Sequence, residues 1–222
     1  MSQLTMFDKT VFLIPAREGS KGFPHKNRKL FMQTLRTMPE ELKSKIYVST
    51  DDPAIKVMAT NEGVDVVHRP IELATDEASL KSVMQHFLKE KNIPDDYNVI
   101  LLFLTYPERT WQDIVEIYSE FLKNTNSSLI CCEETSDHPY LCFKFDEEKS
   151  LGRLVVEHDL YRRQDYPKCV RQSMFFACYK AWVIQDLHDL LFEDNTLFFK
   201  LDEKKIDIDY EIDYNIINTI KE

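Results

Sequence analysis

The chain has 222 residues, enough for one α/β domain with a large core, and we expect a single domain over 1–222. Its 38 acidic and 28 basic residues give a formal net charge of −10, which argues against nucleic acid as a partner, because that binding usually needs a basic face. The apolar runs are too short to cross a membrane, and the first residues lack the pattern of a signal peptide. Five cysteines, none in a C-x-x-C motif, favour reduced thiols and a cytoplasmic protein.

Short apolar runs alternate with segments of helical period from the start of the chain to residue 132. We expect strands at 11–16, 45–50, 64–67, 98–104 and 127–132, and helices at 53–62, 75–88 and 110–122, the last with Thr110 as its N-cap. This alternation predicts a mainly parallel sheet with helices on both faces. Ligands of such sheets bind at the carboxyl ends of the strands.

The pattern becomes less regular after Glu133. We expect strands at 140–145, 174–179 and 197–201 and a helix at 181–191. The segment from about 135 to 200 is therefore expected to form an excursion across the sheet. In the tail, isoleucine and aspartate alternate over 206–209, which predicts a strand, and a helix follows.

A basic loop with glycines follows the first expected strand. It contains Arg17, Gly19, Ser20, Lys21, Gly22, Lys26 and Asn27. Glycines let main-chain N–H groups approach phosphate oxygens, while lysine and arginine supply charge. The loop is not a Walker loop, since it has no G-x-x-x-x-G-K-[ST] motif. This composition indicates a site for a nucleoside triphosphate, and a surface turn is the alternative.

Asp207 and Asp209 are the best candidates for metal ligands. In a strand, both carboxylates would project from one face. Mg²⁺ commonly takes one or two carboxylates and completes its shell with water and phosphate oxygens. The alternative is a solvated polar face, with Asp213 as the cap of the last helix.

Several of these segments, in this order, resemble one enzyme family over nearly the whole chain. They are I-P-A-R-E-G-S-K-G-F-P-H-K-N, V-S-T-D-D-P-A-I, H-R-P-I-E-L-A-T-D-E-A-S, L-L-F-L-T-Y-P-E-R-T, R-R-Q-D-Y-P and I-D-I-D-Y-E-I-D. The family is that of the acylneuraminate cytidylyltransferases, which includes the CMP-sialic acid synthetases and their relatives acting on other nonulosonic acids.

The resemblance implies a three-layer nucleotide-diphospho-sugar transferase-like α/β fold, with a small dimerisation excursion. It implies a Mg²⁺-dependent homodimer that transfers CMP from CTP to a sugar acid and releases pyrophosphate. The nucleotide would contact Arg17, Ser20, Lys21, Lys26, Asn27, Arg69 and Ala78. The metal ligands would be Asp207 and Asp209, and the catalytic residues Arg17, Lys21 and Asp209. The acceptor would contact Phe103, Arg163, Gln164, Phe175 and Tyr179.

The chain departs from the family pattern on the acceptor side. Phe103 and Tyr106 stand where the family usually has glutamine and serine, and Phe175 and Phe176 replace an asparagine and a glycine, while Tyr179 is kept. Lost hydrogen bonds to a substrate change specificity strongly. Three interpretations stay open: a synthetase with an altered acceptor, a nucleotide-binding relative with little transferase activity, and an enzyme that makes another sugar nucleotide.

Overall fold

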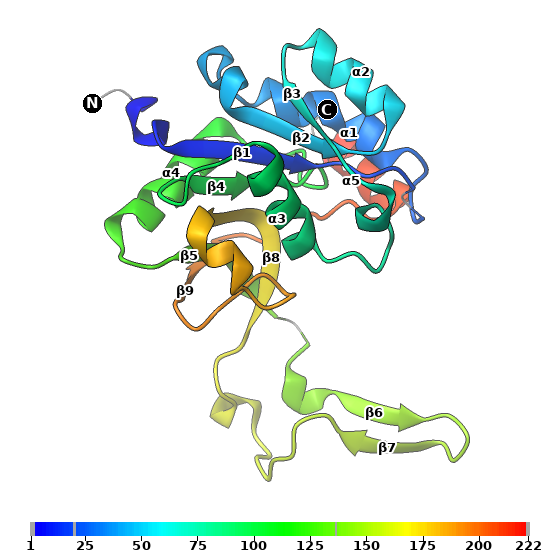
Figure 1. Ribbon diagram of the computed structural model, residues 1–222. Helices are drawn as coiled ribbons and strands as arrows, with labels where there is room; N and C mark the ends of the chain where they lie inside the picture. Colours follow the sequence, from blue (N-terminus) through cyan, green and yellow to red (C-terminus); the bar gives the residue numbers. More distant parts are fainter. Residues whose placement is uncertain (1–2, 20, 136, 221–222) are drawn as a thin grey trace.

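The computed structural model describes residues 3–19, 21–135 and 137–220, and its centre is a seven-stranded sheet with the order β3-β2-β1-β4-β8-β5-β9 (Figure 1). The strands are β1 (Thr10–Pro15), β2 (Ile46–Thr50), β3 (Asp65–His68), β4 (Asn98–Leu101), β5 (Ser128–Glu134), β8 (Val170–Lys180) and β9 (Thr196–Lys200). β8 runs antiparallel to both of its neighbours, and the other pairs are parallel. The prediction of a mainly parallel sheet is confirmed.

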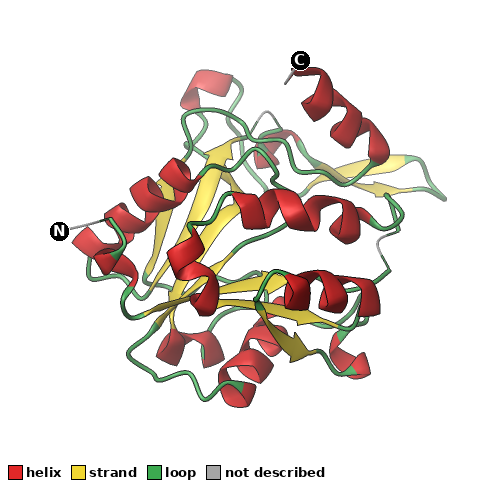
Figure 2. Ribbon diagram, turned by 90° about the horizontal axis from the view of Figure 1, so that it is seen from above, coloured by secondary structure: helices red, strands yellow, loops and turns green. Residues whose placement is uncertain are grey.

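Helices cover both faces of this sheet (Figure 2). One face carries α1 (Lys26–Arg36), α2 (Pro53–Asn61), α4 (Trp111–Lys123) and α5 (Glu211–Ile220), and the other carries α3 (Leu80–Glu90) and a 3₁₀ turn at Ala181–Gln185. Side chains alternate along β1: Phe12 and Ile14 enter the first core, and Val11 and Leu13 the second. The predicted three-layer α/β fold is therefore confirmed.

Helix caps explain where two of the helices begin. The Thr110 hydroxyl and the Asp113 carboxylate form a reciprocal capping box at the start of α4, as expected. α3 begins at Leu80 and not at the predicted Thr75, because the Ser79 hydroxyl accepts the Ser82 N–H. Residues 75–78 consequently form a loop, whose last N–H bonds to the Thr75 hydroxyl.

Three further predictions of elements are wrong. The predicted strand 98–104 ends at Leu101. The chain turns after this residue, and the Arg109 side chain donates to the main-chain carbonyl of Phe103. The predicted helix 181–191 is only the short 3₁₀ turn, after which the chain is irregular and Leu191 has a φ of 65°. The alternating segment 206–209 pairs with no strand among the described residues, and it is held by the Ile208 N–H on Thr105 O at 2.9 Å.

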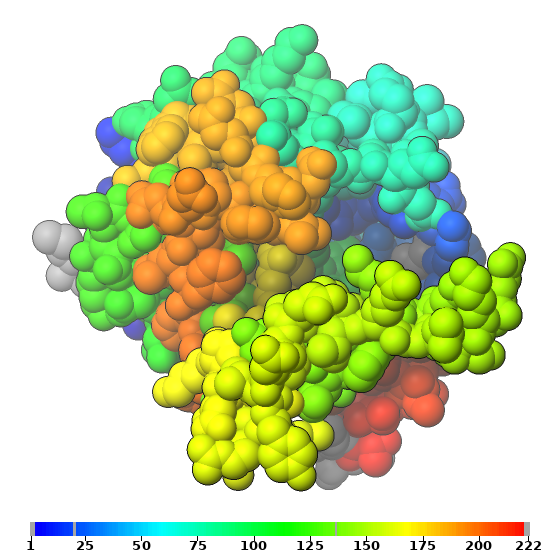
Figure 3. Space-filling view, turned by 90° about the horizontal axis from the view of Figure 1, so that it is seen from below, coloured from blue at the N-terminus to red at the C-terminus, as the bar shows by residue number. Residues whose placement is uncertain are grey.

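The segment between β5 and β8 forms an arm that leaves the body of the molecule. Its ordered part is a hairpin of β6 (Phe143–Asp146) and β7 (Leu151–Leu154), where a longer strand was predicted at 140–145. Figures 1 and 3 show this arm as an extended ridge at one end of the molecule. Because β8 and β9 belong to the central sheet, the excursion comprises fewer residues than the expected range of 135–200.

Within the part of the chain that the structure describes, no helix has the length and apolar character that crossing a membrane requires. All five cysteines are free thiols, and Cys131, Cys132 and Cys178 are buried. Burial raises the pKa of the Cys131 thiol to about 12, which makes this side chain a poor nucleophile.

Candidate functional site

A cleft of about 440 Å³ opens beside the carboxyl ends of the central strands. It is lined by Pro15, Arg17, Lys21, Gly22, Lys26, Asn27, Arg69, Leu73, Thr75, Asp76, Ala78, Leu80, Val83, Phe103, Thr105, Asp209 and Tyr210. We call it the first cleft. It brings together every residue expected to bind the nucleotide except Ser20, which lies outside the described residues.

Two cations of the basic loop meet one carboxylate in this cleft. Asp76 forms ion pairs with both Arg17 and Lys21. Hydrogen bonds from Lys21 and Arg17 hold the pKa of Asp76 below its ordinary value. Asp76 therefore neutralises these two cations. Phosphate oxygens carry the same negative charge and would suit the same two side chains.

The start of α1 joins the loop to the acidic tail. Asn27 donates from its side chain to Arg17 O at 2.8 Å, which fixes the loop. Lys26, with only 12% of its side chain exposed, donates from Nζ to Ile208 O at 2.7 Å and to Asp209 Oδ1 at 3.1 Å. Gly22 is required at this junction, because a Cβ there would lie 2.6 Å from Asp209 O.

Arg69 forms the buried wall of the first cleft. It donates from Nε to Ser49 Oγ at 3.1 Å and from Nη2 to Ser49 O at 2.9 Å. Burial lowers the pKa of Arg69 to about 10, so the side chain is still cationic at neutral pH. A buried cation with a fixed direction suits the recognition of a polar or anionic part of a ligand.

A second cleft of about 530 Å³ adjoins the first and shares Asp209 and Tyr210 with it. The residues that line it are Tyr106, Arg171, Gln172, Met174, Lys204, Lys205, Ile206, Asp207, Asp209, Tyr210, Asp213 and Ile216. Three of them are cationic, and sequence analysis identified none of these three. Arg171 pairs with Glu133, whereas no ion pair involves Lys204 or Lys205 among the described residues.

The acidic pair fits a hard cation. Partial burial raises the pKa of Asp207, and the nearby charge of Asp209 adds to this effect. The two carboxylates are thus close enough to interact, and 64% of the Asp209 side chain is exposed. Two carboxylates with open sides suit Mg²⁺, which keeps several positions for water and phosphate oxygens. The carboxylates come from an unpaired segment and not from the strand expected there.

The residues expected on the acceptor side are not gathered in one place. Phe103 lines the first cleft, but Arg163 and Gln164 lie exposed on the arm, in the 3₁₀ turn Arg163–Asp165. Phe175 and Tyr179 are fully buried, because both faces of β8 are covered by core residues.

The Tyr179 hydroxyl donates to Leu191 O at 3.2 Å, so this side chain belongs to the core and cannot contact a substrate. The expectation that Phe175 and Tyr179 contact the acceptor with their side chains is wrong for this structure.

Sequence reasoning also missed two residues that organise the site. Asp76 lies in T-D-E-A, which was assigned to a helix start, and only its contacts with the basic loop, where Arg17 is 59 residues earlier, reveal its role. Arg109 is buried and donates to Phe175 O at 2.6 Å and to Phe103 O at 2.9 Å. An arginine two residues after a proline gave no signal of burial.

Comparisons with known proteins show the family of this chain. Residues 11–213 match the model of a protein family described as cytidylyltransferase. The N-acylneuraminate cytidylyltransferase of Streptococcus agalactiae is 30% identical over 71% of this chain and 40% of its own length. The pseudaminic acid cytidylyltransferase of Campylobacter jejuni is 26% identical over 90% of this chain and 91% of its own length. The chain thus spans less than half of the streptococcal relative.

Among solved structures, CMP:2-keto-3-deoxy-manno-octonic acid synthetase in complex with CTP superposes with a TM-score of 0.63. The match covers 96% of this chain and 98% of that one at 15% identity, which supports the shared fold. Taken with the family match over residues 11–213, the fold and the residues of the first cleft lead to one conclusion: the chain belongs to the cytidylyltransferase family.

Proposed function

We propose that this protein transfers CMP from CTP to a nonulosonic sugar acid and releases pyrophosphate, with Mg²⁺ as its cofactor. The observation that carries the proposal is the first cleft, whose lining combines the cations Arg17, Lys21 and Lys26 with the carboxylate of Asp209, which Lys26 contacts directly. Phosphate oxygens need the cations, and a phosphate-bound Mg²⁺ needs the carboxylate.

The nucleotide would lie along the first cleft. Arg17 and Lys21 would exchange Asp76 for phosphate oxygens, while Lys26 holds the acidic segment against the loop. Arg69 and Ala78 line the same cleft and would contact the cytidine. Six of the seven residues expected to bind the nucleotide, all but Ser20, line this cleft, which supports the proposal.

The chemistry is an in-line displacement. The anomeric hydroxyl of the acceptor attacks the α-phosphorus of CTP and loses its proton, a new O–P bond forms, and the bond to the β-phosphate breaks to release pyrophosphate. Arg17 and Lys21 would neutralise the charge that develops on the phosphate oxygens. When bound by Asp207 and Asp209, Mg²⁺ would supply Lewis-acid stabilisation of that same charge.

Two observations support a sugar acid as acceptor. Relatives that match this chain act, by their names, on N-acylneuraminate and on pseudaminic acid. The second cleft shares Asp209 with the first and carries Arg171, Lys204 and Lys205, whose charges suit a carboxylate. An acceptor seated there would have its reactive hydroxyl near the acidic pair.

A homodimer formed through the arm is part of the proposal. The hairpin and its flanks expose the apolar side chains Phe143, Phe145, Leu151, Val155 and Tyr161. Such a cluster on a projecting hairpin favours contact with a second copy. The variant Phe145→Asp is expected to be monomeric by light scattering, whereas Val57→Asp on exposed α2 leaves the wild-type mass unchanged. A monomeric wild-type protein would refute the dimer.

The nucleotide specificity can be tested by thermal unfolding with CTP, UTP, ATP and GTP, each with Mg²⁺. Binding to the folded state alone stabilises by about 2.7 kcal/mol at a ligand concentration of 100 times the dissociation constant. CTP is expected to raise the melting temperature most. A larger shift with UTP would instead support an enzyme of another sugar nucleotide, and no shift with any of them would contradict the proposal.

A further inference from the structure

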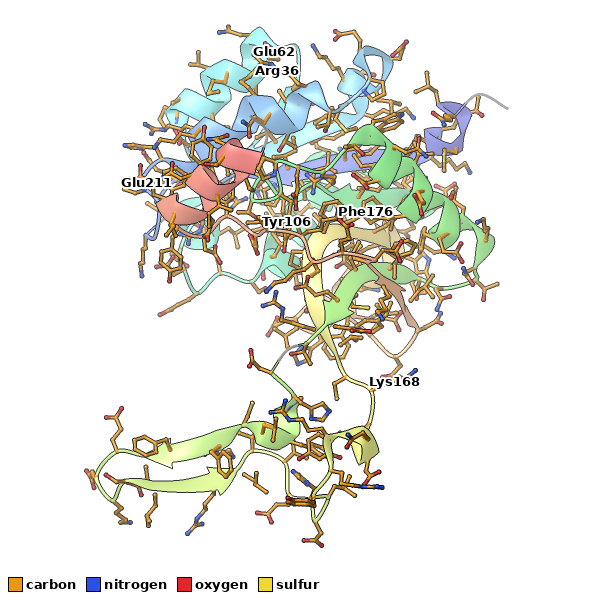
Figure 4. All side chains as sticks on the ribbon, turned by 180° about the vertical axis from the view of Figure 1, so that it is seen from behind. Arg36, Glu62, Tyr106, Lys168, Phe176 and Glu211 are labelled. Carbon is orange, nitrogen blue, oxygen red and sulfur yellow. The ribbon has the colours of Figure 1, made fainter. Side chains whose placement is uncertain are left out.

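Tyr106 joins the acidic segment to the core of the sheet. Only 4% of this residue is exposed, and its hydroxyl donates to Asp207 Oδ2 at 3.1 Å. Its ring meets the ring of Phe175 edge to face, with centroids 5.7 Å apart and planes at 90°. Figure 4 shows Tyr106 in the main body of the molecule, far from Lys168 at the base of the arm. One end of the side chain is thus packed, and the other holds a carboxylate.

The packed end is fixed from several sides. Arg109 donates to Phe175 O and to Phe103 O, so it ties β8 to the turn that carries Tyr106. A tyrosine held in this way cannot change rotamer without breaking core contacts.

The carboxylate end needs such support, because no strand holds the acidic segment among the described residues. Its main-chain contacts include the Ile208 N–H on Thr105 O at 2.9 Å, the Ile206 N–H on Glu108 Oε1 at 2.9 Å and Lys26 Nζ on Ile208 O at 2.7 Å. These bonds fix the backbone, but the direction of the Asp207 side chain depends on its own partners. They are Tyr106 and Thr105, both from the same turn.

We propose that Tyr106 is a positioning residue, which orients the Asp207 carboxylate for the divalent cation and uses the ring of Phe175 as its support. The inference rests on the proposed function for the cation itself. It changes the interpretation of two departures from the family pattern. Tyr106 and Phe175 replace polar residues together, and in this chain they form one matched aromatic contact that serves the acidic pair.

The variant Tyr106→Phe keeps the ring and removes the hydroxyl. Groups that orient metal ligands typically contribute 10- to 100-fold to metal affinity. We therefore propose a titration with Mn²⁺ or Mg²⁺ in the presence of CTP, followed by the rise in melting temperature. The metal concentration at half of the full rise is expected to be about 10-fold higher or more in the variant than in wild type. Without metal, in EDTA, the rise in melting temperature that CTP causes should differ from wild type by less than about twofold. Saturating Mg²⁺ should restore most of the variant's pyrophosphate release.

Tyr118→Phe is the matched control. Tyr118 is also buried, and its hydroxyl bonds to Thr10 and Asn98 at the opposite end of the strands. This variant is expected to lose stability but to keep the wild-type metal titration. Equal metal titrations for wild type and Tyr106→Phe would overturn the role of Tyr106 and leave the proposed function intact. A wild-type protein that binds CTP but gains nothing from a divalent cation would overturn both this role and the metal assignment.

Discussion

Lys26 Nζ lies 3.1 Å from Asp209 Oδ1 and so connects the first turn of α1 to a carboxylate 183 residues further along the chain. The same amine donates to Ile208 O at 2.7 Å. One mostly buried cation therefore holds the phosphate loop and the acidic segment together. The phosphate loop and the acidic segment are therefore in direct contact.

Asp209→Ala tests the acidic segment. Removing an electrostatic group that acts on developing charge costs about 100-fold or more in kcat. We expect that loss in pyrophosphate release, with a change in the free energy of unfolding of no more than about 1 kcal/mol, because most of the Asp209 side chain is exposed and Lys26 keeps its bond to Ile208 O. Asp202→Ala, on the same exposed segment, serves as the control and should remain active. Normal turnover in Asp209→Ala would show that the metal assignment is wrong.

Asp76→Asn tests the competition for the loop cations. Asp76 forms ion pairs with Arg17 and Lys21 and so competes with phosphate oxygens for these cations. Removing its charge should therefore strengthen their binding to phosphate oxygens. An exposed ion pair contributes about 0.2–1 kcal/mol, which corresponds to CTP binding up to about fivefold tighter. Calorimetry at constant salt measures this change. The control is Glu77→Gln, and weaker binding in Asp76→Asn would mean that Asp76 supports the bound nucleotide.

Arg109→Met tests the buried connection between Phe103 and Phe175. The variant leaves two buried carbonyl oxygens without a donor, and each such loss costs about 1–3 kcal/mol, partly offset because no charge is then buried. We expect a net destabilisation of about 2 kcal/mol by urea unfolding. Arg36→Met at the exposed end of α1 should change stability by less than about 0.5 kcal/mol. Equal stabilities of the two variants would contradict the structural role of Arg109.

Asp52→Asn gives a pH-dependent test of the α2 cap. Burial alone would raise the pKa of Asp52, but hydrogen bonds from Arg28 and from the Ala54 N–H outweigh it, and the pKa is lowered. Because the pKa of Asp52 is lower in the folded state, its carboxylate stabilises the folded protein at pH values above the unfolded pKa of about 3.9. This stabilisation is lost as the pH falls through the folded pKa.

The Asn variant is therefore expected to be less stable than wild type by about 1–2 kcal/mol at pH 7, since it keeps the cap and loses the charged hydrogen bond. The difference should narrow below about pH 4. Urea unfolding across this range measures it, with exposed Asp95→Asn as the control. A difference that stays constant with pH would contradict the assignment of the charge to Asp52.

The sequence was informative where one local pattern determines the structure. The apolar run at 11–16 and the cap at Thr110 depend on burial period and on residues three positions apart, so both were predicted closely. The sequence also grouped Arg17, Lys21 and Lys26, which line one cleft, because all three follow the same strand closely.

The rest depends on contacts between distant parts of the chain. The alternation over 206–209 predicts which side chains share a face. It does not predict the hydrogen-bond partner of the backbone, which is the carbonyl of Thr105 and not a neighbouring strand. The buried position of Phe175 follows from the insertion of β8 between β4 and β5, and no local pattern reports strand order. For the same reason, the sequence could not show that Tyr106 and Phe175 are in contact.

The most direct test of the proposed transferase activity is pyrophosphate release from CTP and Mg²⁺ with a panel of nonulosonic and ulosonic acids, alongside a known family enzyme as positive control. We predict CTP-dependent release with at least one sugar acid, and the loss of this release in Asp209→Ala. CTP binding without release for any acid, while the control enzyme turns over, would contradict the proposed transferase activity and support a nucleotide-binding relative.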